Sequence, residues 1–394
     1  MEVYFDNAAT TKVSGAAVSE MVKAMTEDYG NPSSRHTMGY HAELIVNHAR
    51  KTISDSLKCR ESEIIFTSGG TESNNMALTG LAESNKRIGK HIISTRIEHA
   101  SVYNPLLELE SRGYEVTFLN TDEYGRVLPE ELLRNIRSDT VLVSIMAVNN
   151  EVGSVLDVGR LAEITHKCNP NTLFFVDAIQ GYMKLPLYPG RIGIDAMSVS
   201  GHKLHGPKGS GFLYVRDKVK LRPLILGGGQ QKGMRSGTEN VPAIAGLSAA
   251  VEEYKQHFKE NTEHLYDLKE QMVTGLLSLP EVIVHAIPFS EAESVGQAVR
   301  KTAPHIVSAG FAGIKAEVFL HALEEKGIYV SSGSACSSNH PAISGTLSAI
   351  GVDSGLLDST LRFSFTETNT AEEVAYCLQV IGELLPVYRR FKKY

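Results

Sequence analysis

Cysteine is scarce in this sequence. The chain has 4 cysteines in 394 residues, at positions 59, 168, 336 and 377, and no two of them form a C-x-x-C pair. Small secreted proteins that depend on disulfides carry a far higher density of cysteine. We therefore exclude a disulfide scaffold and expect a protein of the reducing cytoplasm.

Basic charge and long apolar runs are also lacking. Lys and Arg number 39 against 45 Asp and Glu, so no positive excess is available for a nucleic-acid backbone. The apolar stretch 141–148 is far short of the roughly 20 residues that span a bilayer. The first residues, MEVYFDNAATTKVSG, have neither the basic nor the apolar region of a secretory signal. We expect no membrane segment and no direct nucleic-acid partner.

Both common nucleotide fingerprints are missing as well. The chain contains neither the G-x-x-x-x-G-K-[ST] loop nor the G-x-G-x-x-G turn. A plain nucleotide-binding protein is therefore disfavoured. Hydrophobic residues make up 42% and charged residues 21%, which predicts a folded globular protein and not a disordered one.

Short apolar runs alternate with helix-period stretches between residues 60 and 215. Runs that are apolar throughout, separated by helices, are typical of a mainly parallel sheet covered on both faces. We therefore predict an α/β fold with about seven strands. The runs are 64–66, 91–94, 114–119, 141–148, 173–176, 196–199 and 211–215.

The remaining sequence indicates a second, smaller unit. Residues 201–240 are Gly-rich loops, and a long helical tract follows from 242 to about 279. Weaker strands and a last helix from 371 to about 385 come after it. Since the chain is two to three times the length of a typical single-core domain, we predict two domains. The large one spans 15–255, and a smaller α+β domain combines 1–14 with 256–394.

A glycine-rich turn at Ser68–Glu72 lies between a predicted strand and a predicted helix. Backbone N–H groups at the start of a helix attract anions, so this turn can hold a phosphate. A tight turn without a ligand explains the residues equally well.

An acid and an amine follow two later strands. Asp177 ends the run 173–176, and Lys203 follows the run 196–199. Each has an ordinary explanation, because such an Asp often caps a helix and such a Lys is often a surface charge. Together with a phosphate turn, they are the parts of a pyridoxal phosphate site: a lysine for the Schiff base, an acid for the ring nitrogen and N–H groups for the phosphate.

Cys336 lies among small polar residues, in S-S-G-S-A-C-S-S-N at 331–339. Structural cysteines usually sit among apolar neighbours, whereas a reactive thiol needs exposure. An accidental surface cysteine is the alternative.

These pieces occur together in one known family. The sequence resembles the NifS-type and IscS-type cysteine desulfurases, which are fold type I pyridoxal phosphate enzymes of the class V aminotransferase group. One stretch departs from the pattern, since Pro304-His305-Ile306 stands where the family often has Pro-Asn-Ile. The matching motifs are Y-F-D-N-A-A-T-T at 4–11, G-N-P-S-S at 30–34, S-G-G-T-E-S-N-N at 68–75, E-H-A-S-V at 98–102, V-N-N-E-V-G at 148–153, V-D-A-I-Q at 176–180, S-G-H-K at 200–203, G-P-K-G at 206–209, M-R-S-G-T at 234–238, S-S-G-S-A-C at 331–336 and L-R-F-S at 361–364.

The resemblance assigns roles to individual residues. It implies that Lys203 holds the cofactor and moves a proton, that His99 stacks on the ring and assists proton transfer, and that Cys336 accepts sulfur as a persulfide. Asp177 would pair with the ring nitrogen, and Gln180 and Asn150 with the phenolic oxygen. The phosphate would contact Gly70, Thr71, Ser200, His202 and, from a second subunit, Thr238; the substrate carboxylate would contact Arg362, Asn31 and Asn150.

The resemblance also implies a reaction and partners. The reaction is the conversion of L-cysteine to L-alanine in a homodimer, with sulfur passed to an iron–sulfur scaffold protein or a tRNA-thiolation enzyme. No metal site is expected, except that Cys336 could ligate an iron–sulfur cluster during transfer. The alternatives are a selenocysteine lyase, another class V pyridoxal phosphate enzyme, or a sulfur-trafficking protein without turnover.

Overall fold

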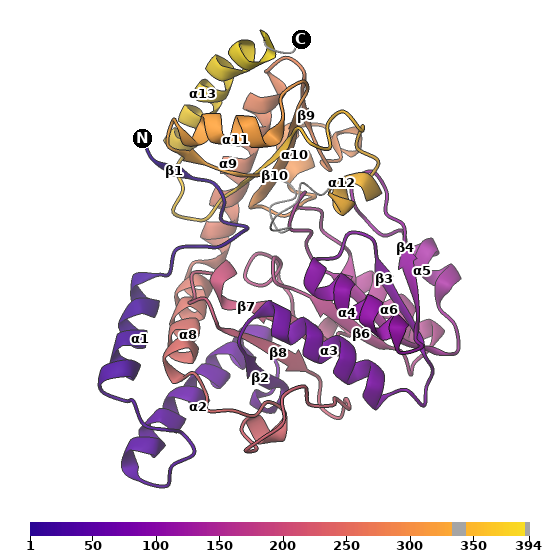
Figure 1. Ribbon diagram of the computed structural model, residues 1–394, viewed down its shortest axis with the longest axis vertical. Coiled ribbons are helices and arrows are strands. Elements are labelled where there is room, and N and C mark those ends of the chain that lie inside the picture. The colour runs from indigo at the N-terminus through magenta and orange to yellow at the C-terminus, as the bar shows by residue number, and fades with distance from the viewer. Residues whose placement is uncertain (333–343, 391–394) are drawn as a thin grey trace.

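The computed structural model describes residues 1–332 and 344–390 and contains a large mixed sheet of seven strands (Figure 1). The strand order is β2-β8-β7-β6-β5-β3-β4. Only β8 runs antiparallel to its neighbours β2 and β7, so the predicted mainly parallel α/β sheet is confirmed. The strands are β2 (Ile64–Thr67), β3 (His91–Thr95), β4 (Glu115–Leu119), β5 (Thr140–Met146), β6 (Leu173–Asp177), β7 (Ala196–Ser200) and β8 (Gly211–Val215).

Apart from the edge strand β4, both faces of this sheet are buried, which explains why its strands occur in the sequence as continuous apolar runs. Successive residues of β6 enter opposite cores: Phe174 and Val176 join one hydrophobic cluster and Phe175 joins another. The helices around the sheet are α1 (Gly15–Thr26), α2 (Thr37–Leu57), α3 (Gly70–Ser84), α4 (Ala100–Ser111), α5 (Pro129–Asn135), α6 (Val158–Cys168), α7 (Pro189–Ile192) and α8 (Val241–Gln256), with short 3₁₀ turns η1 (Glu61–Glu63), η2 (Gly201–Lys203) and η3 (Gln231–Gly233).

A second, antiparallel sheet has its own hydrophobic core, in the upper part of Figure 1. Its order is β12-β13-β10-β9, and β1 pairs separately with β11. The strands are β1 (Val3–Tyr4), β9 (Val282–Val284), β10 (Ile306–Phe311), β11 (Ile328–Tyr329), β12 (Ser331–Ser332) and β13 (Thr360–Ser364). The helices are α9 (Phe258–Leu277), η4 (Phe289–Glu291), α10 (Val295–Val299), α11 (Ala316–Glu324), α12 (Gly345–Ala349) and α13 (Ala371–Arg389).

The helical tract predicted from 242 to 279 is two helices, α8 and α9, separated at His257. His257 leaves the helical conformation with φ −113° and ψ 16°. The break lets α8 bury Leu247 and Val251 in the core of the large sheet, while α9 buries Leu268 and Met272 in the core of the small one. We propose that the domain boundary expected near residue 255 falls at this break.

The segment 5–14 crosses from the small sheet to the large one. The Phe5 N–H donates to Tyr329 O at 2.8 Å, and the Ser364 N–H donates to Phe5 O at 2.7 Å. Further along, the Thr11 N–H donates to His202 O at 2.9 Å. This crossing segment therefore runs past the end of β7. Within the described part of the chain, no helix is both long and apolar enough to cross a membrane.

Candidate active site

Three chain segments converge where β6 and β7 end. β6 ends at Asp177, and β7 leads into η2, which contains Lys203. Because β2 and β7 are both antiparallel to β8, they run in the same direction and α3 begins at the same edge. A Cβ atom on Gly70 would lie 2.2 Å from Ile179 Cδ1 and 3.4 Å from Ser200 Cβ. A larger residue at position 70 would therefore force the Ile179 side chain to move, whereas glycine lets α3 begin close to both strand ends.

The first turn of α3 can bind an anion. Its N-cap, Gly69, provides no side-chain hydrogen bond, so the first N–H groups, including those of Gly70 and Thr71, are not capped by that residue. The helix dipole adds a partial positive charge there. The acidic side chain in this turn, Glu72, is paired with Arg235, whose Nε lies 2.9 Å from Glu72 Oε1. The residues present therefore fit a phosphate group.

His202 lies in η2, directly before Lys203 and two residues after Ser200, whose Cβ approaches Gly70. Its Nδ1 is 3.3 Å from Thr10 Oγ1 in the crossing segment. Burial, together with the positive charges of Lys203 and Lys208, lowers the pKa of His202 to about 4. The imidazole is therefore neutral at pH 7 in the absence of an anion.

Asp177 is buried and hydrogen-bonded. Its Oδ1 accepts the Ile179 N–H at 3.0 Å, and its Oδ2 accepts from Asn74 Nδ2 at 2.9 Å. Burial raises the pKa of this carboxyl, whereas the Ile179 N–H, the Asn74 amide and the nearby His99 and Lys203 favour its charged form. A buried acid in such a position is suited to bind a cationic ring nitrogen.

The same asparagine links Asp177 to His99. Asn74 Nδ2 also donates to Ser101 Oγ at 2.8 Å, and Ser101 Oγ lies 2.8 Å from His99 Nδ1. The Ser101 backbone N–H also donates to His99 Nδ1, at 3.1 Å. Since this nitrogen accepts, the proton of the neutral ring resides on Nε2.

Lys203 and Gln180 converge on the crossing segment. Lys203 Nζ donates to the carbonyl oxygens of Ala8 and Ala9 at 2.6 and 2.7 Å. Gln180 Nε2 donates to the same Ala8 oxygen at 2.9 Å. The lysine, which follows β7, and the glutamine, which follows β6, therefore lie side by side.

Arg362, on β13, reaches this region from the small sheet. Its two terminal nitrogens donate at 2.8 Å to Asn150 O and to Asp6 Oδ1. The residue is only 4% exposed, and its Nε is buried without a hydrogen-bond partner in the described structure. A buried guanidinium with an unused donor is suited to bind a carboxylate.

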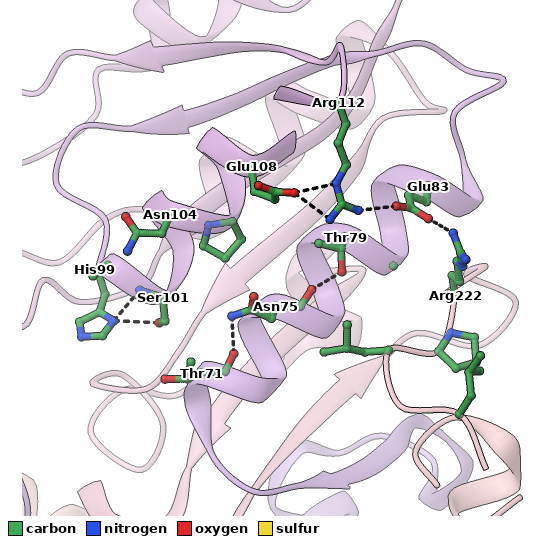
Figure 2. Close-up of a pocket in the computed structure, with 16 residues that line it drawn as sticks. Thr71, Asn75, Thr79, Glu83, His99, Ser101, Asn104, Glu108, Arg112 and Arg222 are labelled. Atoms are coloured by element: carbon green, nitrogen blue, oxygen red, sulfur yellow. Dashed lines mark hydrogen bonds and ion pairs between the residues drawn. The ribbon is translucent and has the colours of Figure 1, made fainter. Parts of the chain in front are cut away.

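A groove of about 690 Å³ opens beside His99 and runs between α3 and α4 (Figure 2). Thr71, His99 and Ser101 lie at one end of it. At the other end Arg112 pairs with Glu83, which also pairs with Arg222. The groove therefore connects the cluster with the outer surface of the protein.

Two of the predicted site residues lie away from the cluster, and a third lies outside the part of the chain that the structure describes. Asn31 is exposed in the loop between α1 and α2, which lies at the opposite end of the molecule from the small sheet (Figure 1). Thr238 is also exposed and lines a separate pocket with Ser68 and Arg235. Cys336 lies outside the described residues.

The structure adds residues that the sequence did not single out. Asn74 occurs in the S-G-G-T-E-S-N-N motif, and its place one helical turn after Gly70 could have suggested that it faces the same side. Asp6 gave no such signal, because its contact with Arg362 depends on how the crossing segment lies. Ser101 lies in the E-H-A-S-V motif, and its contact with Asn74 forms only because α3 packs against α4.

Glu98 is a further ionisable group next to the cluster. Its Oε1 accepts from Thr95 Oγ1 at 2.8 Å and from the Met146 N–H at 3.0 Å. The residue as a whole is partly exposed, but its Oε2 is inaccessible to solvent and has no partner among the described residues. Burial, strengthened by the charge of Asp177, raises the pKa of Glu98 to about 8.

We expect Glu98→Gln to stabilise the protein at pH 7–8 and to stabilise it much less at pH 5. Between the unfolded pKa, about 4.3, and the folded pKa, the folded state binds the extra proton, so wild-type stability falls as pH rises. A glutamine stays neutral and avoids this loss, which is on the order of 2–4 kcal/mol at pH 7. Urea unfolding at pH 5, 7 and 8 measures the difference.

The matched control is Glu110→Gln, on the exposed face of α4, which we expect to leave stability unchanged at each pH. A Glu98→Gln protein whose stability relative to wild type is independent of pH would show that Glu98 is ionised in the folded state.

The chain is similar to known proteins over nearly its whole length. It matches the family model of class V aminotransferases over residues 3–377. It is 41% identical to the cysteine desulfurase IscS of Methanosarcina thermophila, over 98% of this chain and 93% of that protein. It is 39% identical to the mitochondrial cysteine desulfurase of Candida albicans, over 98% of this chain and 78% of that protein. Among solved structures, a NifS-like protein superimposes with a TM-score of 0.90 at 38% identity, covering 98% of this chain and all of the other.

Proposed function

Because the chain belongs to the class V aminotransferase family, and within it to the pyridoxal phosphate-dependent cysteine desulfurases, we propose that the cluster at the ends of β6 and β7 is its active site. One observation carries this proposal: Asp177 and the Lys203 segment end neighbouring strands beside the uncapped start of α3. The reaction is the conversion of L-cysteine to L-alanine with transfer of sulfane sulfur to an enzyme thiol.

The cluster fits pyridoxal phosphate. Gly70 and Thr71 would hold the phosphate, with Ser200 and His202 beside it, and Asp177 would pair with the ring nitrogen. Asn150 and Gln180 would donate to the phenolic oxygen. When bound, the cofactor supplies the electron sink that makes the substrate Cα–H acidic.

Two groups would handle protons. Lys203 would hold the cofactor covalently, and its amine, once released by substrate, would move a proton to or from Cα. The first turn of α4 holds His99 through its Nδ1, which accepts the Ser101 N–H. The ring proton is therefore on Nε2. We assign His99 to stacking on the cofactor ring and to proton transfer at the substrate.

Arg362 would bind the substrate carboxylate. Its guanidinium is already oriented by Asp6 and by the Asn150 carbonyl, so little side-chain freedom is lost on binding. Asn150 would border the substrate on the other side, and Asn31 would supply a second contact from another subunit.

The sulfur-transfer step is assigned to Cys336. The Cys336 thiolate would attack the substrate Sγ, so that an S–S bond forms while the substrate Cβ–Sγ bond breaks. The bonding pair stays on the substrate carbon, which takes up a proton and becomes alanine. The substrate sulfur atom stays bound to Cys336 as a persulfide.

Alanine formation from L-cysteine, measured on protein that shows the visible absorption of bound pyridoxal phosphate, tests this assignment. Absence of either signal would contradict it. Selenocysteine lyase is the nearest alternative, and alanine formation that is faster from L-selenocysteine than from L-cysteine, with an added thiol reducing the released selenium to selenide, would favour it. A trafficking protein without turnover would give no alanine at all.

We also propose that the enzyme is a homodimer with shared active sites. Helices α1 and α2 and the loop between them expose large apolar side chains, which a second copy of the chain would cover. Asn31 and Thr238, both exposed, would then reach the partner's cluster. The exposed apolar side chains are Val18, Val22, Met25, Tyr29, Tyr40 and Leu44.

A mixing experiment tests this sharing. Lys203→Ala inactivates the site of its own chain, and Thr238→Glu, by repelling the phosphate, inactivates the site of the partner. A hybrid of the two variants contains one site with neither defect, so refolding them together should recover up to about a quarter of wild-type activity. If hybrids form but no activity returns, Thr238 acts within its own subunit.

The destination of the sulfur is proposed on chemical grounds. A persulfide is reactive and needs an acceptor thiol, and such exchange fits the reducing cytoplasm expected from the cysteine content. We propose an iron–sulfur scaffold protein or a tRNA-thiolation enzyme as acceptor. No cluster of three side chains that could ligate a metal occurs among residues 1–332 and 344–390. Because Cys336 lies outside these residues, its role as a ligand of an iron–sulfur cluster stays a prediction. Transfer of ³⁵S from cysteine to each purified acceptor distinguishes the two.

A further inference from the structure

His305 joins the small sheet to the active-site cluster. It lies immediately before β10, and its carbonyl accepts the Phe365 N–H at 2.9 Å. Its ring is buried, and its Nε2 lies 3.1 Å from Gln180 Oε1 in the loop after β6. A residue of the small sheet therefore contacts a residue proposed to touch the cofactor.

The neighbouring atoms determine the orientation of the Gln180 amide and the tautomer of the His305 ring. Ala8 O can only accept, so Gln180 turns its amide nitrogen toward Ala8 and its oxygen toward His305. Gln180 Oε1 can likewise only accept, so His305 Nε2 must carry the proton. The remaining nitrogen, His305 Nδ1, is buried with no hydrogen-bond partner in the described structure, as the unprotonated atom of this tautomer can be.

The surroundings keep this ring neutral. Burial lowers the pKa of His305 well below its usual value, and the positive charges of Lys184, Lys269, Arg362 and Lys203 lower it further. A neutral ring donates one hydrogen bond to Gln180 over the whole range in which the enzyme would work. The contact is therefore not interrupted by titration.

We propose that His305 is a positioning residue that locks the orientation of the Gln180 amide, so that one N–H binds Ala8 O and the other is presented to the phenolic oxygen of the cofactor. This inference rests on the proposed function, because it needs Gln180 beside that oxygen. Without His305 the amide could rotate, and the Lys203-bound cofactor would lose a fixed donor. Since a donor stabilises negative charge on that oxygen, its loss favours the protonated form of the cofactor–lysine linkage.

The test is a pH titration of the visible absorption of the purified holoenzyme. We expect His305→Leu to move the midpoint upward by about half a unit to one unit, the shift that corresponds to one ordinary hydrogen bond. Gln180→Leu should move it by the same amount or more. His305→Gln should restore the wild-type midpoint, because its amide nitrogen is as many bonds from the backbone as His305 Nε2.

A double variant separates positioning from a general structural effect. If His305 acts through Gln180, then His305→Leu should add nothing to the midpoint shift of Gln180→Leu. Additive shifts, or an unchanged midpoint in His305→Leu while Gln180→Leu moves it, overturn the inference and leave the proposed site standing. An unchanged midpoint in both variants overturns the inference and the assigned role of Gln180 together. Should His305→Leu not fold, His305→Phe provides the same loss of the donor in a ring of similar shape.

Discussion

Lys203→Ala is expected to abolish alanine formation and to leave the cofactor without a covalent attachment. Proton transfer by a positioned group contributes about 10²–10⁴-fold to a rate, and this variant also loses the covalent linkage, so turnover should fall by at least about 10³-fold. Borohydride reduction followed by mass spectrometry of the peptide measures the attachment directly.

The matched control is Lys220→Ala, an exposed lysine after β8, which should keep both turnover and the reducible adduct. Unfolding curves of the two variants show whether each is folded under the assay conditions, so that a loss of turnover can be separated from a loss of structure. A cofactor adduct that borohydride still fixes in Lys203→Ala would show that another amine holds the cofactor.

Cys336→Ser should stop alanine formation from L-cysteine while the visible absorption of the bound cofactor is kept. A thiolate is a strong nucleophile toward sulfur, whereas a serine hydroxyl is not ionised near neutral pH and forms no persulfide. The variant should still bind L-cysteine, which a spectral change on mixing would report. Loss of turnover with a retained spectral response separates sulfur transfer from cofactor and substrate binding.

The other cysteines supply the controls. Burial raises the pKa of Cys59 to about 12 and raises that of Cys377 as well, so neither thiol is suited to this step. Cys168 is exposed at the end of α6. Cys168→Ser should therefore have wild-type turnover. Alanine formation that survives in Cys336→Ser but is lost in Cys168→Ser would move the sulfur-accepting role to Cys168.

The large sheet could be predicted from the sequence because six of its seven strands are buried on both faces, the edge strand β4 being the exception. That burial also indicated where each strand ends, and the polar residues directly after β6 and β7 could then be placed at one edge. Asp177 and Lys203 were found in this way. The break at His257 could not be predicted, since the residues around it continue a helical pattern and the break reflects packing into two separate cores.

The contacts between distant segments could not be predicted either. The link from Asp177 through Asn74 and Ser101 to His99 requires the packing of α3 against α4. The pairing of Asp6 with Arg362 requires β1 to join β11. Such contacts have no local signature, because the residues at either end follow no shared periodicity.

The crossing segment has a consequence for biosynthesis. Asp6 and Arg362 are 356 positions apart, so the first leaves the ribosome long before its partner has been translated. The Ala8 N–H likewise cannot form its hydrogen bond until Ser364, whose hydroxyl accepts it, has been translated. The large sheet can form earlier from nearer neighbours, because contacts of low sequence separation close first. A nascent chain halted before β13 should therefore fold most of the large sheet and still lack the proposed substrate site, so that sulfur chemistry begins only after β13 has been translated.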